Sequence, residues 1–281
     1  MEIKVLNYKG QPLSEVRPAY FLKAFGKEVL NMRIFSFGRC NYSCSYCKRD
    51  GYNKSSLDIC GAVSISEEKF MLAVNDAIAK RQVVRLSGGD PVCYPTFTKK
   101  VLKYAKEKGA ITSVAHNGSA PYLVQSIVKY LDFASIDFKA STYQKLAKIA
   151  CIDENMAKQC FDNTIETINI LAKNNVYVDV RTCIFEDTTY EELDTIARYI
   201  QIGGFNENKF WTLRTYSPVD SCDKKAKTDQ EMREIAVRLS QKYTDLKIGV
   251  RIKWVPGGFL YFHNGKELND NEIKLPKQKV N

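Results

Sequence analysis

The sequence is poor in histidine, a common ligand of single metal ions: among 281 residues the only histidines are His116 and His263. It has no apolar run near the length of a membrane span, and its first residues, MEIKVLNYKG, lack the basic and then apolar layout of a signal peptide. These absences predict a cytoplasmic protein with no membrane partner. In a reducing compartment structural disulfides are disfavoured, so clustered cysteines indicate metal binding or catalysis.

The charge is unbalanced, with a formal net charge of +10, but much of the excess is dispersed lysine. Aromatic residues interleaved with arginine and lysine, which a single-stranded nucleic-acid surface needs, are not visible outside one cysteine-rich loop. The dispersed charge and the missing aromatic pattern argue against a nucleic-acid partner. The net positive charge suits an acidic or phosphorylated substrate, which a positive field would attract.

From residue 32 onward, short β-rich runs alternate with amphipathic helical patterns, as in parallel βαβ units. The expected strands are MRIFSF, QVVRLSG, ITSVAH, FASIDFK, VYVDVRTCIF and KFWTLRTYS. Capping boxes are expected to open three of the helices, at Ser64 with Glu67, Thr189 with Glu192 and Thr228 with Glu231. Residues 140–160 have no clear pattern.

Six such units predict an α/β fold, either an open doubly wound sheet or a barrel. We favour a partial (β/α)6 barrel of the TIM type, with a short N-terminal strand and a C-terminal extension. The expected division is residues 1–31 as an N-terminal strand and lead-in and residues 32–216 as the partial barrel. Residues 217–281 would form a helix, a strand and a tail that cover the barrel mouth.

The loop after the first of these strands, GRCNYSCSYCKRDG, carries Cys40, Cys44 and Cys47 in the spacing CxxxCxxC. Three thiolates can hold a cube of iron and sulfide and leave one iron without a protein ligand. Structural zinc takes four ligands, and neither histidine lies in the loop, so zinc is the weaker hypothesis. The other six cysteines are scattered along the sequence. They are expected either to be small core residues or, through Cys151 and Cys160, to contribute to an auxiliary cluster.

Polar motifs also follow the later strands, and in parallel α/β folds such loops meet at one mouth. They are SGGD at 87–90, HNGS at 116–119, Asp137 with Lys139 in IDFK, and Arg181 in the fifth strand. Each has a structural alternative: SGGD as a tight glycine turn, Asp137 and Lys139 as a plain ion pair, and Arg181 as a partner of Asp179 or Glu186. Their order and common placement favour a shared site.

Together these motifs resemble the radical S-adenosylmethionine (radical SAM) superfamily, over residues 32 to about 216. The resemblance implies a [4Fe-4S] cluster on Cys40, Cys44 and Cys47, whose fourth iron is chelated by S-adenosylmethionine. Electron transfer would then cleave a C–S bond and leave a 5′-deoxyadenosyl radical, which takes a hydrogen atom from the substrate. Tyr46 stands where the family often places an aromatic residue near the adenine.

Further roles follow from this resemblance. SGGD matches the family's Gly-Gly-Glu-Pro motif, which implies that the backbone of Ser87, Gly88 and Gly89 and the carboxylate of Asp90 hold the methionyl amino group. Asn117 in HNGS would make a polar contact with the cofactor. Arg181 would clamp the cofactor carboxylate, a task suited to a guanidinium fork.

Asp137 and Lys139 resemble the Asp-x-Lys element of activating enzymes for glycyl radical enzymes, including those of anaerobic ribonucleotide reductase. Ala115 departs from that pattern, because those enzymes often carry an aspartate there, and this puts a cation-assisted cofactor site in doubt. The predicted function is a radical SAM enzyme working anaerobically with an electron donor such as flavodoxin or ferredoxin, with a glycyl radical enzyme as its partner. The alternatives are direct modification of a small molecule, nucleotide or peptide, and a non-catalytic metal-binding module that contacts RNA.

Overall fold

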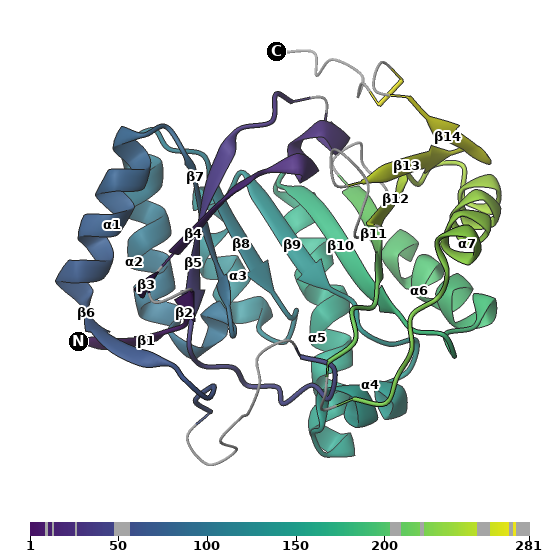
Figure 1. Ribbon diagram of the computed structural model, residues 1–281, viewed down its shortest axis with the longest axis horizontal. Helices are drawn as coiled ribbons and strands as arrows, with labels where there is room; N and C mark the ends of the chain where they lie inside the picture. The colour runs from purple at the N-terminus through teal and green to yellow at the C-terminus, as the bar shows by residue number, and fades with distance from the viewer. Residues whose placement is uncertain are drawn as a thin grey trace.

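The computed structural model describes residues 1–8, 11–12, 14–25, 27–47, 57–202, 209–219, 222–251, 259–269 and 272–273. Its centre is a sheet with a run of parallel strands that pair in chain order (Figure 1). These strands are β5 (Asn31–Phe37), β7 (Val83–Gly88), β8 (Thr112–His116), β9 (Phe133–Asp137), β10 (Tyr177–Ile184), β11 (Lys209–Thr215) and β12 (Ile248–Arg251).

Helices connect successive parallel strands and cover one face of the sheet (Figure 1). They are α1 (Glu67–Ala79), α2 (Pro95–Glu107), α3 (Pro121–Ile127), α4 (Tyr143–Ala150), α5 (Glu154–Lys173), α6 (Tyr190–Ile202) and α7 (Asp229–Lys242). No helix of the described residues is long and apolar enough to cross a membrane.

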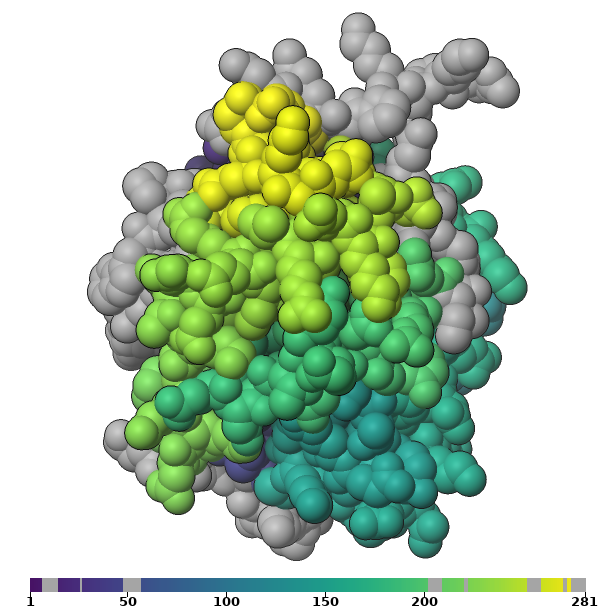
Figure 2. Space-filling model, turned by 90° about the vertical axis from the view of Figure 1, so that its right-hand side faces the viewer, coloured from purple at the N-terminus to yellow at the C-terminus, as the bar shows by residue number. Residues whose placement is uncertain are grey.

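Antiparallel strands extend both edges of the sheet. Beyond β5 lie β1 (Glu2–Val5), β4 (Ser14–Pro18) and β6 (Val63–Ser66), and beyond β12 lie β13 (Leu260–His263) and β14 (Lys266–Leu268). Figure 2 shows the C-terminal strands lying against the segment that contains α7. Within the described residues the two edges do not pair with each other, so the sheet is a partial barrel that stays open, and the predicted fold class is confirmed.

Alternation along the strands separates two faces of the sheet. Val180 on β10, Leu213 on β11 and Val250 on β12 are fully buried in the large cluster formed with the helices. Their neighbours, such as Arg181 and Thr212, lie on the opposite, concave face. The helix-covered face is therefore apolar, and the polar residues of the strands gather on the concave face.

A short 3-10 helix, η1 (Tyr20–Phe25), packs on the concave face near the first residues of the strands. The rings of Phe21 and Phe133 lie 5.5 Å apart, and those of Phe25 and Tyr177 lie 4.8 Å apart. These aromatic contacts fill the N-terminal end of the concave face. The carboxyl ends of the strands are left as the place for a site.

The predicted helix starts are correct at two of three positions. Thr189 and Thr228 each bond the backbone of the glutamate three residues later, as capping boxes require. The prediction for Ser64 is wrong: this residue lies in β6, and Ser66 caps α1 by accepting from the Lys69 amide. The β-branched and serine-rich run VSIS pairs with β1 and delays the helix by two residues.

Candidate active site

The cysteine loop is held by a helix for which the sequence showed no clear pattern. The amides of Ser43 and Ser45 donate to the carbonyls of Ala150 and Ile149, at 3.0 and 3.1 Å. These carbonyls end α4, where a helix has no internal partners for them, so loop and helix satisfy each other. The segment 140–160 therefore forms α4 and the start of α5, and α4 positions the cysteines.

The two glycines of SGGD let the end of β7 touch the chain that leads into the cysteine loop. The Gly89 amide donates to the Phe37 carbonyl, and the Asp90 amide donates to the Arg39 carbonyl, both at 2.7 Å. A Cβ on Gly89 would lie 1.9 Å from the Arg39 carbonyl oxygen, and Gly88 has φ +100°. Backbone contact therefore requires glycine at both positions.

The carboxylate of Asp90 is almost fully buried and bonds protein groups with both oxygens. It accepts from the amides of Asn117 at 2.8 Å and Val92 at 2.9 Å, and it lies 2.7 Å from Nδ1 of His116. Nε2 of His116 accepts from the Ala120 amide at 3.2 Å, which places the proton on Nδ1. Asp90 and His116 thus fasten the loop after β7 to the loop after β8.

A closed ring of hydrogen bonds joins the cysteine loop to the HNGS loop. Asn117 Nδ2 donates to Asn41 Oδ1 at 2.7 Å, Asn41 Nδ2 donates to Ser119 Oγ at 2.9 Å, and Ser119 Oγ donates to Asn117 Oδ1 at 2.7 Å. Asn41 was not predicted as a site residue. Its position between two of the clustered cysteines was the available signal.

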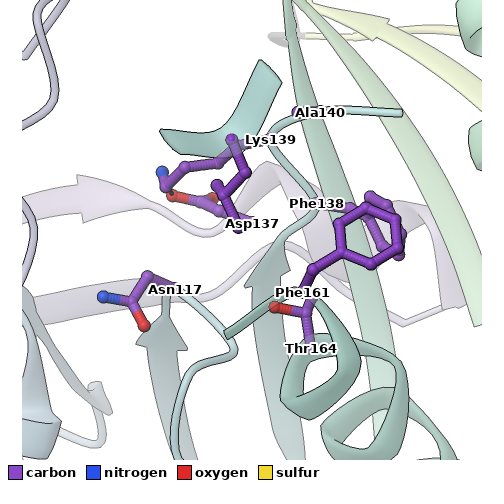
Figure 3. A pocket seen from close by; sticks show the side chains of 8 residues that line it. Asn117, Asp137, Phe138, Lys139, Ala140, Phe161 and Thr164 are labelled. Atoms are coloured by element: carbon purple, nitrogen blue, oxygen red, sulfur yellow. Dashed lines mark hydrogen bonds and ion pairs between the residues drawn. The ribbon is translucent and has the colours of Figure 1, made fainter. Parts of the chain in front are cut away.

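Asp137 lies between two cations, Lys139 and Arg181, at the carboxyl ends of β9 and β10. Figure 3 shows Asp137 and Lys139 side by side. Lys139 Nζ is 2.9 Å from Asp137 Oδ2, and Arg181 Nη2 is 2.7 Å from Oδ1. Burial alone would raise the pKa of Asp137, but Arg181 and Lys139 outweigh it and hold that pKa well below its usual range. The ion pair of Asp137 and Lys139 is confirmed, and the ion-pair partner of Arg181 is Asp137 rather than Asp179 or Glu186.

Tyr46 connects this charged group to the cysteine loop. Lys139 Nζ is 3.3 Å from the Tyr46 hydroxyl and 5.6 Å from the centre of its ring. Burial would lower the pKa of Lys139, but Asp137 outweighs it and keeps the ammonium charged. In Figure 3 Asn117, Asp137 and Lys139 line the same pocket, while Phe138 and Phe161 lie on its other side. Motifs from two loops therefore line this pocket, and Tyr46 of the cysteine loop contacts one of its lining residues, Lys139.

Below this group a buried polar layer crosses the concave face. Arg85 donates to Ser113 Oγ at 2.7 Å and to Ser135 Oγ at 2.8 Å, and Ser135 and Thr212 donate to Asp179 at 3.2 and 2.5 Å. Burial lowers the pKa of Arg85 to about 9 and raises the pKa of Asp179. The sequence signal for this layer was one polar residue at alternate positions in each strand.

The three loop cysteines are partly buried, and their thiols have different surroundings. Burial, the largest cause, raises the pKa of Cys44 to about 11 and that of Cys40 well above its usual value. Iron must therefore displace protons from these thiols on binding. Among the described residues no three Cys, His, Asp or Glu side chains approach closely enough for one metal ion. Three thiols carried by one loop are the kind of donor that holds an iron–sulfur cluster, and they leave one iron without a protein ligand, so the residue types fit a cluster.

The remaining predicted site residues lie where the strand ends meet. Ser87 and Gly88 end β7, and Asn117 follows β8. Of the two cysteines considered for an auxiliary cluster, Cys160 is buried on α5 and Cys151 is exposed at the end of α4.

The chain is similar in sequence to a known family and to known proteins. Residues 34–200 match the model of the Radical SAM superfamily. A Methanocaldococcus jannaschii protein provisionally named a glycyl-radical enzyme activating enzyme is 26% identical over 238 residues, which cover 80% of this chain and 90% of that protein. A GTP 3′,8-cyclase from Klebsiella pneumoniae (strain 342) is 24% identical over 180 residues, which cover 63% of this chain and 53% of that one.

Two solved structures share the fold. TYW1 with a lysine-pyruvate adduct superposes with a TM-score of 0.59 at 14% identity, covering 92% of this chain and 88% of that one. A radical SAM methyltransferase from Sphaerobacter thermophilus has a TM-score of 0.61 at 10% identity, covering 92% and 76%. The family match spans more than half of the chain and contains the cysteine loop. The chain therefore belongs to the radical SAM superfamily and is an enzyme of that class, which uses a [4Fe-4S] cluster and S-adenosylmethionine.

Proposed function

We propose that this enzyme cleaves S-adenosylmethionine reductively and activates a glycyl radical enzyme by removing a hydrogen atom from a glycine of that partner. One observation carries the proposal: Tyr46 of the cysteine loop contacts Lys139, which pairs with Asp137, which pairs with Arg181. The cluster ligands and the residues suited to hold the cofactor thus border one mouth. The relative provisionally named an activating enzyme, matched over 90% of its length, supports the choice of reaction.

Cys40, Cys44 and Cys47 would hold the cluster and leave one iron for S-adenosylmethionine. When bound, this pair supplies a 5′-deoxyadenosyl radical that takes the substrate hydrogen atom. The protein's task is to hold the cofactor still and keep water away. The contacts of the loop with α4 and with the HNGS loop serve this task, because they fix the thiols before the cluster arrives.

Arg181 is the residue we assign to the cofactor carboxylate. Its Nη2 is paired with Asp137, while its buried Nε has no hydrogen-bond partner among the described residues. A guanidinium with a free donor beside a fixed carboxylate is suited to hold a carboxylate through a further bond. Tyr46 would lie near the adenine, and Asn117 would make a polar contact with the cofactor.

The methionyl amino group would be held at the end of β7. The backbone of Ser87, Gly88 and Gly89 is proposed for this role, and Gly89 already uses its amide on Phe37. The carbonyl oxygens of this turn would therefore accept the hydrogen bonds of the amino group. Asp90 would have to share its carboxylate between the amino group and its three protein partners.

The electron donor would be a small carrier such as flavodoxin or ferredoxin in an anaerobic cytoplasm. The decisive experiment mixes the reconstituted enzyme, S-adenosylmethionine and reductant with the glycyl radical enzyme encoded nearest to its gene. A glycyl radical signal in electron paramagnetic resonance is expected only when both proteins are present. Formation of 5′-deoxyadenosine without any such signal would instead favour direct action on a small molecule, nucleotide or peptide.

A further inference from the structure

The concave face carries more arginines than carboxylates. On the parallel strands from β7 to β12, the described charged residues of this face are Arg85, Asp137, Asp179, Arg181, Arg214 and Arg251. Arg214 follows Thr212 at the strand's period of two, and Thr212 bonds the concave-face residue Asp179. This positive excess lies at the same mouth as the cysteine loop.

Two of the arginines are already compensated. Arg181 is paired with Asp137 at 2.7 Å. Arg85 is bonded to two serines, and one of these donates to Asp179. Both carboxylates also act on the other two arginines through space, because Arg214 helps to lower the pKa of Asp137 and Asp179 raises the pKa of Arg251. Among the described residues, neither carboxylate is bonded to those two arginines.

The other two arginines stand beside each other. Arg214 on β11 and Arg251 on β12 are directly paired in the parallel register, so their side chains share the concave face. Among the described residues, neither forms an ion pair or a hydrogen bond. Like charges at neighbouring positions of a sheet repel and reduce stability. Arg251 is exposed and Arg214 half-buried, so both remain accessible from solvent.

We infer that Arg214 and Arg251 form a binding site for an anionic group of the substrate, either a phosphate or a carboxylate. This inference deepens the proposed function and rests on it, because it describes the substrate of the same mouth. The guanidinium fork matches both anions in a bidentate manner, and two forks together suit a group with several oxygens. The cofactor has one carboxylate, for which Arg181 is already in place.

The electrostatics of the face agree with this reading. Arg251 is exposed as a whole residue, but its charged group is partly desolvated by surrounding protein atoms. This desolvation is the largest cause that lowers the pKa of Arg251 to about 10; Arg214, Arg181 and Arg17 lower it further, while Asp179 raises it. A bound anion would relieve this repulsion. The net charge of +10 would also draw an anionic substrate toward the protein, with strong dependence on salt.

The test measures anion binding by isothermal titration calorimetry on the cluster-loaded enzyme with S-adenosylmethionine. The probes are inorganic tripolyphosphate, GTP, and a short peptide with a glycine between two glutamates, with its glutamine counterpart as the neutral blank. Wild type is compared with the double variant Arg214→Gln/Arg251→Gln. The control is Arg238→Gln on α7, which removes the same charge from a guanidinium that stacks on Tyr190.

We expect at least one anionic probe to bind wild type, the double variant to weaken that affinity at least tenfold, and the control to stay within twofold. Binding of the phosphates alone would identify a phosphorylated substrate, and binding of the acidic peptide alone an acidic segment of a partner protein. Equal affinity in the double variant, or no anion binding by wild type, would overturn the inference. If the double variant loses its iron, the two single variants take its place.

Production of 5′-deoxyadenosine by wild type in the same preparation is measured alongside. Its absence would count against the proposed reaction. Its presence together with unchanged anion binding in the variant would remove only the anion site.

Discussion

The two faces of the sheet differ in what holds them together. The helix-covered face is apolar, with Val180, Leu213 and Val250 fully buried among helix side chains. The concave face is bound by directional contacts, such as those of Arg85 with two serines and of Asp137 with Lys139. Apolar packing tolerates exchange of similar shapes, whereas a buried polar network fails when one member loses its partner. Stability should therefore depend on the first face and chemistry on the second.

The largest effect is expected at the cysteine loop, on the functional side of this comparison. Cys44→Ala removes one of the three proposed cluster ligands, so iron content after reconstitution should fall severely and turnover should be abolished. Iron analysis and the visible absorption of the cluster measure this. Cys60→Ala, at an exposed cysteine outside the loop, is the control and should retain iron. A colourless but active Cys44 variant would remove the radical mechanism.

On the helix-covered face, Leu213→Ala should reduce the free energy of unfolding by about 3 kcal/mol, because it leaves a cavity in a packed core. Urea unfolding of the metal-free protein measures the change. Leu72→Ala on α1, where the side chain is 63% exposed, should change stability by less than about 0.5 kcal/mol. Equal losses in the two variants would mean that the helix-covered face is not the stabilising one.

A polar exception on the helix side allows a test by pH. Asp194 on α6 lies 2.6 Å from Lys242 Nζ, 2.5 Å from Arg198 Nη2 and 2.8 Å from the Tyr243 hydroxyl. Burial alone would raise its pKa, but these bonds outweigh burial and lower the pKa to about 2. Asp194→Asn should cost about 2 kcal/mol at pH 7, the typical contribution of hydrogen bonds to a charged group.

The pH dependence has a definite sign. Because the pKa of Asp194 is lower in the folded protein than the unfolded value of about 3.9, its ionised form adds stability above that value. This contribution is lost as pH falls through the folded pKa. The stability difference between wild type and Asp194→Asn should thus be constant from pH 7 to about 5 and shrink below about 4. A difference that grows on acidification would refute the assignment.

Arg181→Lys separates cofactor binding from cluster binding on the concave face. A point ammonium cannot reproduce the guanidinium fork, so affinity for S-adenosylmethionine should fall about tenfold, or about 1.4 kcal/mol, with iron content unchanged. Equilibrium dialysis of the loaded enzyme measures this. Unchanged affinity would mean that the cofactor carboxylate is held elsewhere.

The smallest effect is expected at the start of α7. Thr228→Ala removes the side chain that accepts from the Glu231 amide and should cost about 1 kcal/mol of stability. Thr228→Ser keeps the hydroxyl and should recover most of the loss. Thermal unfolding of the three proteins decides whether the cap contributes as expected.

The fold was largely predictable because the spacing of apolar residues along the sequence shows which side of each strand or helix is buried. Strands such as VYVDVRTCIF alternate apolar and polar residues, and the helices between them carry caps, so the order of the βαβ units follows from local patterns. The delay of α1 to Ser66 was not predictable, because pairing with the distant strand β1 decides it.

The sequence suggested a candidate site where the proposed chemistry requires rare residue types, as at Cys40, Cys44 and Cys47. The supports of that site were not predictable, because they depend on contacts across the fold. Asn41 bonds Asn117 from 76 residues away, and the carbonyls of α4 bond the cysteine loop from more than 100 residues away. Neither contact leaves a local pattern in the sequence.

The most direct test of the central claim, that the cysteine loop and the charged strand ends form one radical SAM site, is anaerobic. The enzyme is reconstituted with iron and sulfide, given S-adenosylmethionine and a strong reductant, and assayed for 5′-deoxyadenosine by mass spectrometry. The account predicts that wild type forms 5′-deoxyadenosine and that replacing Cys40, Cys44 or Cys47 abolishes it. A cluster-loaded wild-type enzyme that binds S-adenosylmethionine but forms no 5′-deoxyadenosine, with or without its partner protein, would contradict the account.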